Sequence, residues 1–251
     1  MSDGRAGMWR MFAIILAVVA LGLAAALTQR QDTGTASAPS ATVTVTVTAT
    51  PGSAGTVESG DQAAREKWLL EVPRRVADDP MAKGAVDAPV VLTEWADYRC
   101  PFCNVWAKDT LPLLQSFVDD GSLRIEFRDL AIFGDDSVAA AAAARAAGEQ
   151  GLFWEFQHAL YAALPAQGHP PVDDALVERV AGEVGVPDIA AFMASYRSEE
   201  TRAAVVASSA EAQQMGISST PTFLIGSEVI SGAQPVDVFE SVIREQLAKH
   251  G

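Results

Sequence analysis

The spacing of apolar residues changes repeatedly after residue 60, and the order of the changes predicts one α/β domain. Apolar runs with the length of strands occur at 90–97, 123–128, 222–225 and 229–230. The second run alternates apolar with charged residues, so one of its faces should be polar. Helical spacing occurs at 63–70, 105–118, 137–214 and 236–247. This order predicts an α/β domain over 61–251 that carries a helical insertion at about 136–214.

Turn and breaker residues delimit several of these elements. Pro101 suits the first turn of a helix, where its missing N–H costs no hydrogen bond, and Gly121 is placed to end that helix. Gly226–Ser227 separates the last two strands as in a β-hairpin. Breaks in the helical block are expected at 165–171 and 185–187, which contain proline and glycine.

The N-terminal region decides the expected compartment. Residues 11–29 are uncharged and mostly apolar, and Arg10 and Arg30 bracket them. At a rise of about 1.5 Å per residue they span about 28 Å, close to the hydrocarbon thickness of a bilayer. The basic flank predicts a cytoplasmic N-terminus at 1–10, a transmembrane anchor at 11–29 and an extracytoplasmic domain. A signal peptide cleaved near 24–26, which would release a secreted domain, is the alternative.

Residues 30–60 are predicted to be a flexible linker. They are rich in Thr, Ser, Ala, Gly and Pro, and such a stretch lacks the large side chains needed to offset its ordering entropy. Residues 42–48 alternate Thr with Val, a pattern that alone would indicate a strand. Pro39 and Pro51 bracket this alternation and no second strand lies nearby, which favours the linker.

Charge and metal-ligand content exclude several classes of function. The formal net charge of -14 argues against nucleic acid as a partner, because phosphate binding needs an excess of Lys and Arg. The chain has two cysteines and no second C-x-x-C motif, and His158, His169 and His250 are scattered. A zinc site usually has four ligands, so neither a metal nor another cofactor is expected.

The spacing of Cys100 and Cys103 instead indicates redox chemistry. Cys100 follows a predicted strand and begins a predicted helix, where free N–H groups and the helix dipole favour a thiolate. Cys103 lies one turn later, close enough to attack a mixed disulfide. We expect Cys100 to be the nucleophile and Cys103 the resolving thiol. A purely structural bridge is disfavoured, since so short a loop adds little stability.

Two segments carry a resemblance to a known family. Residues 91–103, VLTEWADYRCPFC, are similar to the active-site segment of the DsbA-like branch of the thioredoxin superfamily. Residues 216–225, GISSTPTFLI, are similar to the cis-proline loop and following strand of that family. The similarity covers roughly 75–250. It implies a thioredoxin fold with an inserted helical domain, and a cis peptide bond at Thr220–Pro221.

The resemblance also implies roles for residues around the cysteines. Glu94 falls where relatives place a carboxyl group beneath the redox pair, which would let it exchange a proton with Cys103. Strand alternation leaves open whether Glu94 is instead an exposed strand residue. Asp97 and Arg99 are expected to flank the site and tune its electric field.

Substrate binding is predicted for Pro101 and Phe102 and for the loop of Thr220 and Pro221. In relatives the backbone of this loop pairs with an extended substrate segment. Pro221 could alternatively only begin an edge strand. Trp95 fits either the substrate surface or the core.

The expected function is that of an extracytoplasmic dithiol oxidase that introduces disulfides into exported proteins. The substrates would be thiols of exported proteins, and the resemblance implies a membrane quinone-linked partner that reoxidises the pair. The helical insertion and the lack of a recognisable dimerisation domain favour a monomeric oxidase. A reductase or isomerase is an alternative, because Thr220 resembles the residue at this position in some reducing relatives. A redox-inactive peptide-binding or chaperone-like module is an alternative of another class.

Overall fold

The computed structural model describes residues 64–250. The predicted N-terminus at 1–10, the anchor or signal sequence at 11–29 and the linker at 30–60 lie outside the described residues. Within 64–250 none of the helices is both long and apolar enough to cross a bilayer. The predicted helix at 63–70 is present as a helix over 64–70.

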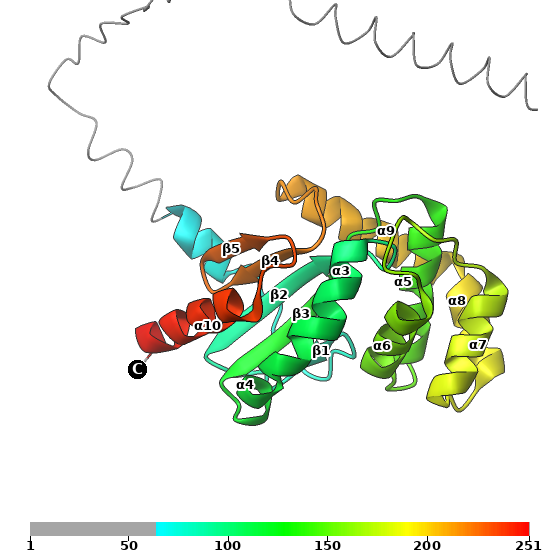
Figure 1. The fold of residues 1–251 in the computed structure, drawn as a ribbon, viewed down its shortest axis with the longest axis horizontal. Helices are drawn as coiled ribbons and strands as arrows, with labels where there is room; N and C mark the ends of the chain where they lie inside the picture. The colour runs from blue at the N-terminus through cyan, green and yellow to red at the C-terminus, as the bar shows by residue number, and fades with distance from the viewer. Residues whose placement is uncertain (1–63, 251) are drawn as a thin grey trace, which may run out of the picture. The chain divides into compact units, whose positions relative to one another are not determined.

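A five-stranded mixed sheet forms the centre of the domain (Figure 1). Its strands are β1 (Ala82–Lys83), β2 (Val90–Ala96), β3 (Leu123–Asp129), β4 (Thr222–Ile225) and β5 (Glu228–Ser231). They lie in the order β1-β3-β2-β4-β5, with β2 parallel to β3 and the other pairs antiparallel. The four predicted strands and the hairpin are confirmed, and the two-residue β1 is an addition.

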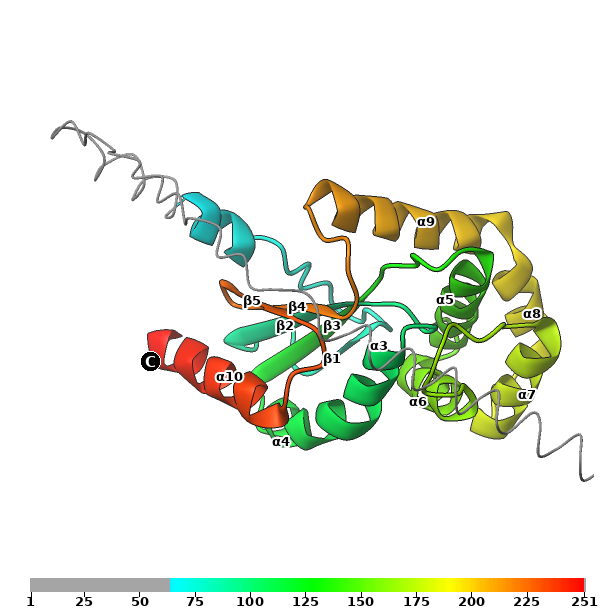
Figure 2. The same cartoon turned by 45° about the horizontal axis from the view of Figure 1, so that its top comes forward.

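Helices cover both faces of the sheet (Figures 1 and 2). The helical run over 101–119 and α10 (Val236–His250) lie on one face. Helix 64–70 and α9 (Glu199–Gln214) lie on the other face, where Leu69, Trp95 and Leu224 share a small core with Ala212. Both faces of β2 are therefore buried along its whole length.

The helical run that begins directly after Cys100 is irregular. It consists of α3 (Pro101–Val105), the π-helical η1 (Trp106–Thr110), the 3-10 helix η2 (Leu111–Leu114) and α4 (Gln115–Asp119). A regular helix was expected at 105–118. Pro112 has no N–H to donate, and its ring would clash with the carbonyl group four residues earlier. The chain widens before this proline, so that the Leu111 N–H reaches Trp106 O. Gly121, with φ of 79°, ends the run as predicted.

The predicted insertion consists of five helices, of which the first four lie beside the sheet (Figure 1). They are α5 (Asp135–Gly148), α6 (Phe153–Ala163), α7 (Asp174–Val184), α8 (Ile189–Arg197) and α9. The breaks expected at 165–171 and 185–187 are confirmed. Two further breaks, at 149–152 and at Ser198, were not expected. Ser198 is the N-cap of α9, since its side chain accepts a hydrogen bond from Thr201 N.

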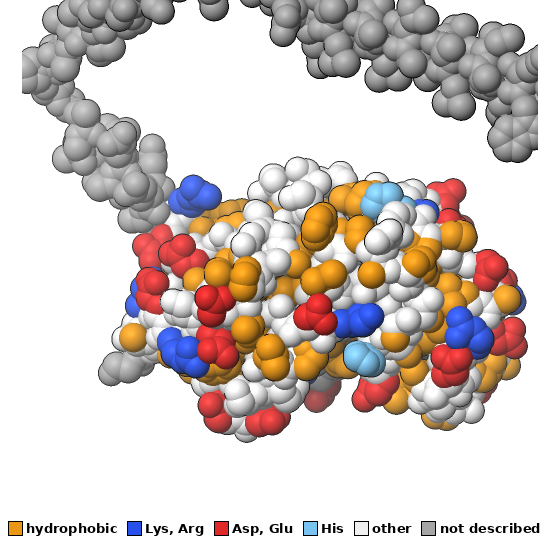
Figure 3. Space-filling model, in the orientation of Figure 1, with side chains coloured by type: hydrophobic (Ala, Val, Ile, Leu, Met, Phe, Trp, Pro, Cys, Tyr) orange, Lys and Arg blue, Asp and Glu red, His pale blue; other side chains and the backbone are white. Residues whose placement is uncertain are grey.

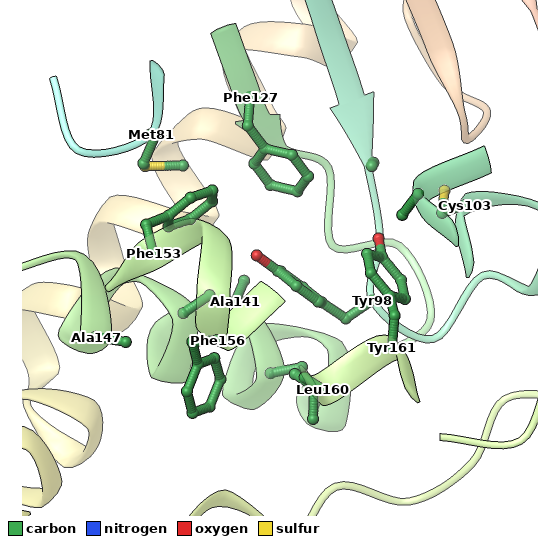
Figure 4. Packing of buried hydrophobic residues seen from close by; sticks show 14 of the residues in the cluster. Met81, Tyr98, Cys103, Phe127, Ala141, Ala147, Phe153, Phe156, Leu160 and Tyr161 are labelled. Atoms are coloured by element: carbon green, nitrogen blue, oxygen red, sulfur yellow. The ribbon is translucent and has the colours of Figure 1, made fainter. Parts of the chain in front are cut away.

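Aromatic side chains join the sheet to both sets of helices. Trp106 and Phe239 pack against Phe223 of β4, with ring centroids 4.6 and 4.9 Å away. On the insertion side, Tyr98 stacks on Tyr161 of α6 with centroids 5.2 Å apart. Figure 4 shows these two tyrosines between Cys103 and the buried side chains of the insertion. The insertion and the sheet thus share one continuous core.

The polar face predicted for β3 is present but buried. Its central residue, Glu126, accepts hydrogen bonds from Arg124 Nε at 3.1 Å and Arg128 Nη2 at 3.0 Å. The backbone N–H groups of Arg74 and Arg75 also donate to this carboxylate, at 2.9 and 2.8 Å. The segment before β1 therefore covers the charged face and satisfies its polar groups.

Candidate active site

Cys100 lies at the junction between the active-site turn after β2 and the first turn of α3. Its backbone is extended, with φ of -79° and ψ of 121°, and Pro101 occupies the first helical turn. The Cys100 N–H donates to Asp97 O at 3.1 Å, which closes the turn. Both thiols are unpaired, and Cys103 is completely buried. The sequence thus places the two sulfurs on one helical turn, as predicted.

The surroundings of Cys100 favour its thiolate. Hydrogen bonding from the Cys103 thiol is the main cause that lowers the Cys100 pKa to about 6 from an ordinary value of 9.0. Burial opposes this shift, whereas Thr220 and the backbone N–H groups of Phe102 and Cys103 support it. A pKa of about 6 means that roughly nine-tenths of the thiol is ionised at pH 7.

Cys103 has the opposite character. Its burial raises its pKa well above the ordinary value, and the neighbouring Cys100 sulfur adds to the shift. The pair therefore holds one thiolate and one thiol at neutral pH. This division fits a nucleophile at residue 100 and a resolving thiol at residue 103.

Glu94 is buried beneath the pair, so the exposed alternative is wrong. In the register of the sheet it lies between Phe127 of β3 and Phe223 of β4. Both carboxyl oxygens are buried without a hydrogen-bond partner in the described chain. Burial raises the Glu94 pKa to about 8, with Lys83 opposing the shift, and the Glu94 charge in turn raises the Cys103 pKa. The carboxyl group and the thiol are electrostatically coupled.

Chain folding brings the loop of Thr220 and Pro221 to the redox pair. The peptide bond between these residues is cis, as the resemblance implied. The protonated Cys100 thiol donates to Thr220 O at 3.3 Å, across 120 positions of sequence. The hydroxyl oxygen of Thr220 is buried and has no hydrogen-bond partner in the described chain, which leaves the hydroxyl able to donate to the Cys100 thiolate.

The two aromatic candidates for substrate contact differ in exposure. Phe102 is 63% exposed, whereas Trp95 is 3% exposed and packs in the core under helix 64–70. Trp95 therefore belongs to the core. Phe102 is free to contact a substrate, although its binding role stays a prediction.

Sequence reasoning missed the main contacts of Asp97 and Arg99. Asp97 is buried, and its carboxylate accepts hydrogen bonds from the N–H groups of Arg99, Ile132 and Phe133. The Arg99 side chain reaches backbone carbonyls around 170. No sequence pattern links Arg99 with a loop some seventy positions later, so this connection could not be foreseen.

Surface charge is mixed over the described residues, among which no metal-ligand cluster accompanies the cysteines. On the face shown in Figure 3, acidic and basic side chains alternate with hydrophobic ones. Over 64–250, no three His, Cys, Asp or Glu side chains are grouped so that they could hold a metal ion. The ionisable groups that are coupled to one another at this site are the two sulfurs and the buried carboxyl group of Glu94.

A thioredoxin fold that carries such a cysteine pair defines a thiol–disulfide oxidoreductase. The family model described as thioredoxin matches residues 77–245. The chain belongs to this family, and within it to the DsbA-like oxidoreductases with inserted helices.

Similar proteins and solved structures agree with this assignment. Disulfide bond formation protein D of Bacillus subtilis is 28% identical over 65% of this chain and 75% of its own length. The crystal structure of oxidised BdbD from Bacillus subtilis has a TM-score of 0.63 and 27% identity, and covers 68% of this chain and 94% of that chain. A thioredoxin-like oxidoreductase from Silicibacter pomeroyi has a TM-score of 0.57 and 27% identity, with 73% and 97% covered.

Proposed function

We propose that this thiol–disulfide oxidoreductase is a dithiol oxidase that donates its Cys100–Cys103 disulfide to exported proteins. The lowered pKa of Cys100 carries this proposal. A stabilised thiolate makes the reduced pair more stable and its disulfide more oxidising. The lowered pKa of Cys100 also makes its sulfur the better leaving group when the mixed disulfide with a substrate is resolved.

The proposed exchange has two steps. A substrate thiolate attacks Cys100 Sγ, the Cys100–Cys103 bond breaks, and its electron pair leaves with the Cys103 sulfur. The protonated Glu94 supplies the proton that this sulfur takes up. A second substrate thiolate then attacks the substrate sulfur of the mixed disulfide, and Cys100 leaves as a stabilised thiolate. The substrate loses two electrons and the cysteine pair gains them.

Substrate positioning in this proposal relies on groups next to the Cys100 sulfur. The exposed Phe102 ring offers an apolar contact, and the backbone around Thr220 and Pro221 would pair with an extended substrate segment. Pro101 begins the helix next to Cys100, where its missing N–H costs no hydrogen bond.

The proposed location is the outer face of the cell membrane. The apolar stretch at 11–29 with its basic flank supports an anchor, and the likeness to a disulfide bond formation protein supports an oxidising compartment. Each turnover leaves a dithiol, so a quinone-linked membrane protein is the proposed electron acceptor. A signal peptide would instead yield a secreted domain.

The reduction potential of the Cys100–Cys103 couple tests the direction of exchange. An oxidase requires a potential above about -180 mV, whereas a value near -270 mV would assign a reductase. Insulin reduction, refolding of a scrambled protein and oxidation of a reduced peptide are measured alongside. Inactivity in all three would favour the redox-inactive binding module.

A further inference from the structure

The loop at 165–171 connects α6 to α7 and is joined to the active-site turn by one side chain. Arg99 donates from Nε to Pro170 O at 2.7 Å and from Nη2 to His169 O at 2.6 Å. Its Nη1 donates to Phe133 O, so one planar guanidinium holds carbonyls of two separate segments. The side chain is only 12% exposed.

A second connection runs from the loop to the active-site turn through the side chain of His169. Its Nδ1 lies 3.0 Å from Arg99 O and donates to this acceptor. Its ring stacks on Phe133 with centroids 3.7 Å apart and an interplanar angle of 20°. Arg99 and His169 thus bind each other's backbone carbonyl reciprocally.

These contacts are the whole hydrogen-bonded attachment of the loop within the described chain. Every hydrogen bond that joins 165–171 to another part of 64–250 has Arg99 as a partner. The loop contains three prolines and a glycine and forms neither helix nor strand. Its position against the active-site turn is therefore held by the hydrogen bonds of this one arginine together with the stacking of His169 on Phe133.

The 165–171 loop lies where it can contact a substrate bound at Cys100. His169 contacts the carbonyl group of Arg99, the residue that directly precedes the nucleophile. Residues 165–169 are exposed. The N–H groups of Ala166, Gln167 and Gly168 make no hydrogen bond inside the described chain. They can pair with the backbone of an extended peptide, whereas the carbonyls of His169 and Pro170 are already used by Arg99.

We propose that Arg99 is a positioning residue that fixes the 165–171 loop, with His169, as one wall of the protein-substrate site beside Cys100. The inference rests on thiol–disulfide exchange in general and holds for either direction of exchange. Arg99 acts through the loop and not through the sulfur, whose lowered pKa arises from Cys103, Thr220 and the local N–H groups. A substrate too small to reach the loop should be unaffected by Arg99.

Single-turnover reduction of the Cys100–Cys103 disulfide in the full chain, by an excess of a reduced peptide carrying two cysteines or of dithiothreitol, tests this. The half-saturating concentration of the reductant gives KM, and the limiting rate gives kcat. Arg99→Met should raise the KM for the peptide by about fivefold or more and leave kcat within about twofold. The rate with dithiothreitol and the pH midpoint of Cys100 ionisation should not change. Arg99→Lys should not restore the peptide KM, because an ammonium group lacks the planar fork that reaches three carbonyls.

The control is Arg197→Met. Arg197 lies in the same insertion but pairs with Asp174 at the exposed surface, so its peptide KM should equal that of the wild type. An unchanged peptide KM in Arg99→Met would overturn the proposal. An equal loss with dithiothreitol would also overturn it, since Arg99 would then act on the sulfur.

A second variant keeps the test open if Arg99→Met does not fold. His169→Ala removes an exposed ring and leaves the guanidinium bonds to both loop carbonyls in place. It should raise the peptide KM without changing the dithiothreitol rate. A wild-type peptide KM in this variant would contradict the assignment of His169 to the wall. A measured potential typical of a reductase would refute the oxidase proposal and leave this inference untouched.

Discussion

The buried carboxyl group of Glu94 raises the pKa of the buried Cys103 thiol, so each group disfavours the ionisation of the other. Neither carboxyl oxygen has a hydrogen-bond partner in the described chain. Ionised Glu94 is therefore costly in the folded state. The cost has consequences for both stability and exchange.

Glu94→Gln should stabilise the reduced protein in a pH-dependent manner. The folded pKa of about 8 lies above the ordinary value of 4.5, so the favourable contribution of protonated Glu94 is lost as pH rises from 4.5 through 8. The variant has no such loss. Its free energy of unfolding should exceed that of the wild type by little at pH 5 and by a few kcal/mol at pH 8.

Urea unfolding of the reduced proteins at several pH values measures this difference. Glu228→Gln on the exposed β5 is the control and should follow the wild type. A difference between Glu94→Gln and wild type that stays constant between pH 5 and 8 would show that Glu94 is not titrating in this range.

Glu94→Gln should also slow the exchange reaction. The Cys103 sulfur needs a proton when it leaves the disulfide, and an amide group cannot supply one. Stopped-flow reduction of the disulfide by a peptide dithiol should be slower by about tenfold or more. The wild-type rate should decline near pH 8, where Glu94 loses its proton, and this decline should be absent in the variant. The Cys100 pKa should stay near its wild-type value. If the rate and its pH profile match the wild type, Glu94 is not the proton donor.

The two cysteines should have separable roles. Cys103→Ala leaves the nucleophile Cys100 but no thiol to resolve a mixed disulfide. It should accumulate covalent adducts with substrate proteins, which non-reducing gels and mass spectrometry detect. Cys100→Ala should form no adducts and catalyse no exchange. An adduct-free Cys103→Ala protein would contradict the assigned roles.

The Cys100 thiol should ionise with a midpoint near pH 6. Its alkylation rate in the reduced protein should rise between pH 5 and 7 and then reach a plateau. Because the folded pKa is lowered, its stabilising contribution is complete above the unfolded value near 9 and is lost as pH falls through 6. As the pH falls from 9 to 6, the free energy of unfolding of the reduced protein should fall relative to that of the oxidised protein. A midpoint near 9 would remove the basis of the proposed chemistry.

The sequence predicted the redox pair because its chemistry is local. Cys100, Pro101 and Cys103 lie within one turn, and the change from strand to helix spacing around them places the first sulfur at a helix start. The sequence left open whether Glu94 is buried or exposed. Alternation of apolar and polar residues indicates which side chains are buried only when one face of the strand is exposed. Both faces of β2 are covered, so the pattern carried no such information.

Longer-range features could not be predicted from spacing. Whether Arg99 contacts the loop at 165–171 depends on how the insertion packs against the sheet, which local propensity does not encode. The widening of the helix before Pro112 was in principle visible, because an internal proline disrupts helical hydrogen bonding. Apolar periodicity concealed it, since the buried face continues through the irregular turns.

Thr220 should set part of the Cys100 pKa through its hydroxyl group. Its buried oxygen has no other partner in the described chain, and the residue supports the thiolate. Thr220→Val keeps the shape of the side chain and removes the donor, so the midpoint of Cys100 ionisation should rise by about one pH unit. The couple should become less oxidising, because the reduced thiolate loses stabilisation. Thr220→Ser, which retains the hydroxyl, should stay close to the wild type. Thiolate absorbance measures the midpoint, and equilibration with glutathione measures the potential. If Thr220→Val and Thr220→Ser have the same midpoint, the hydroxyl does not contact the thiolate, and the Cys103 thiol and the backbone N–H groups cause the shift.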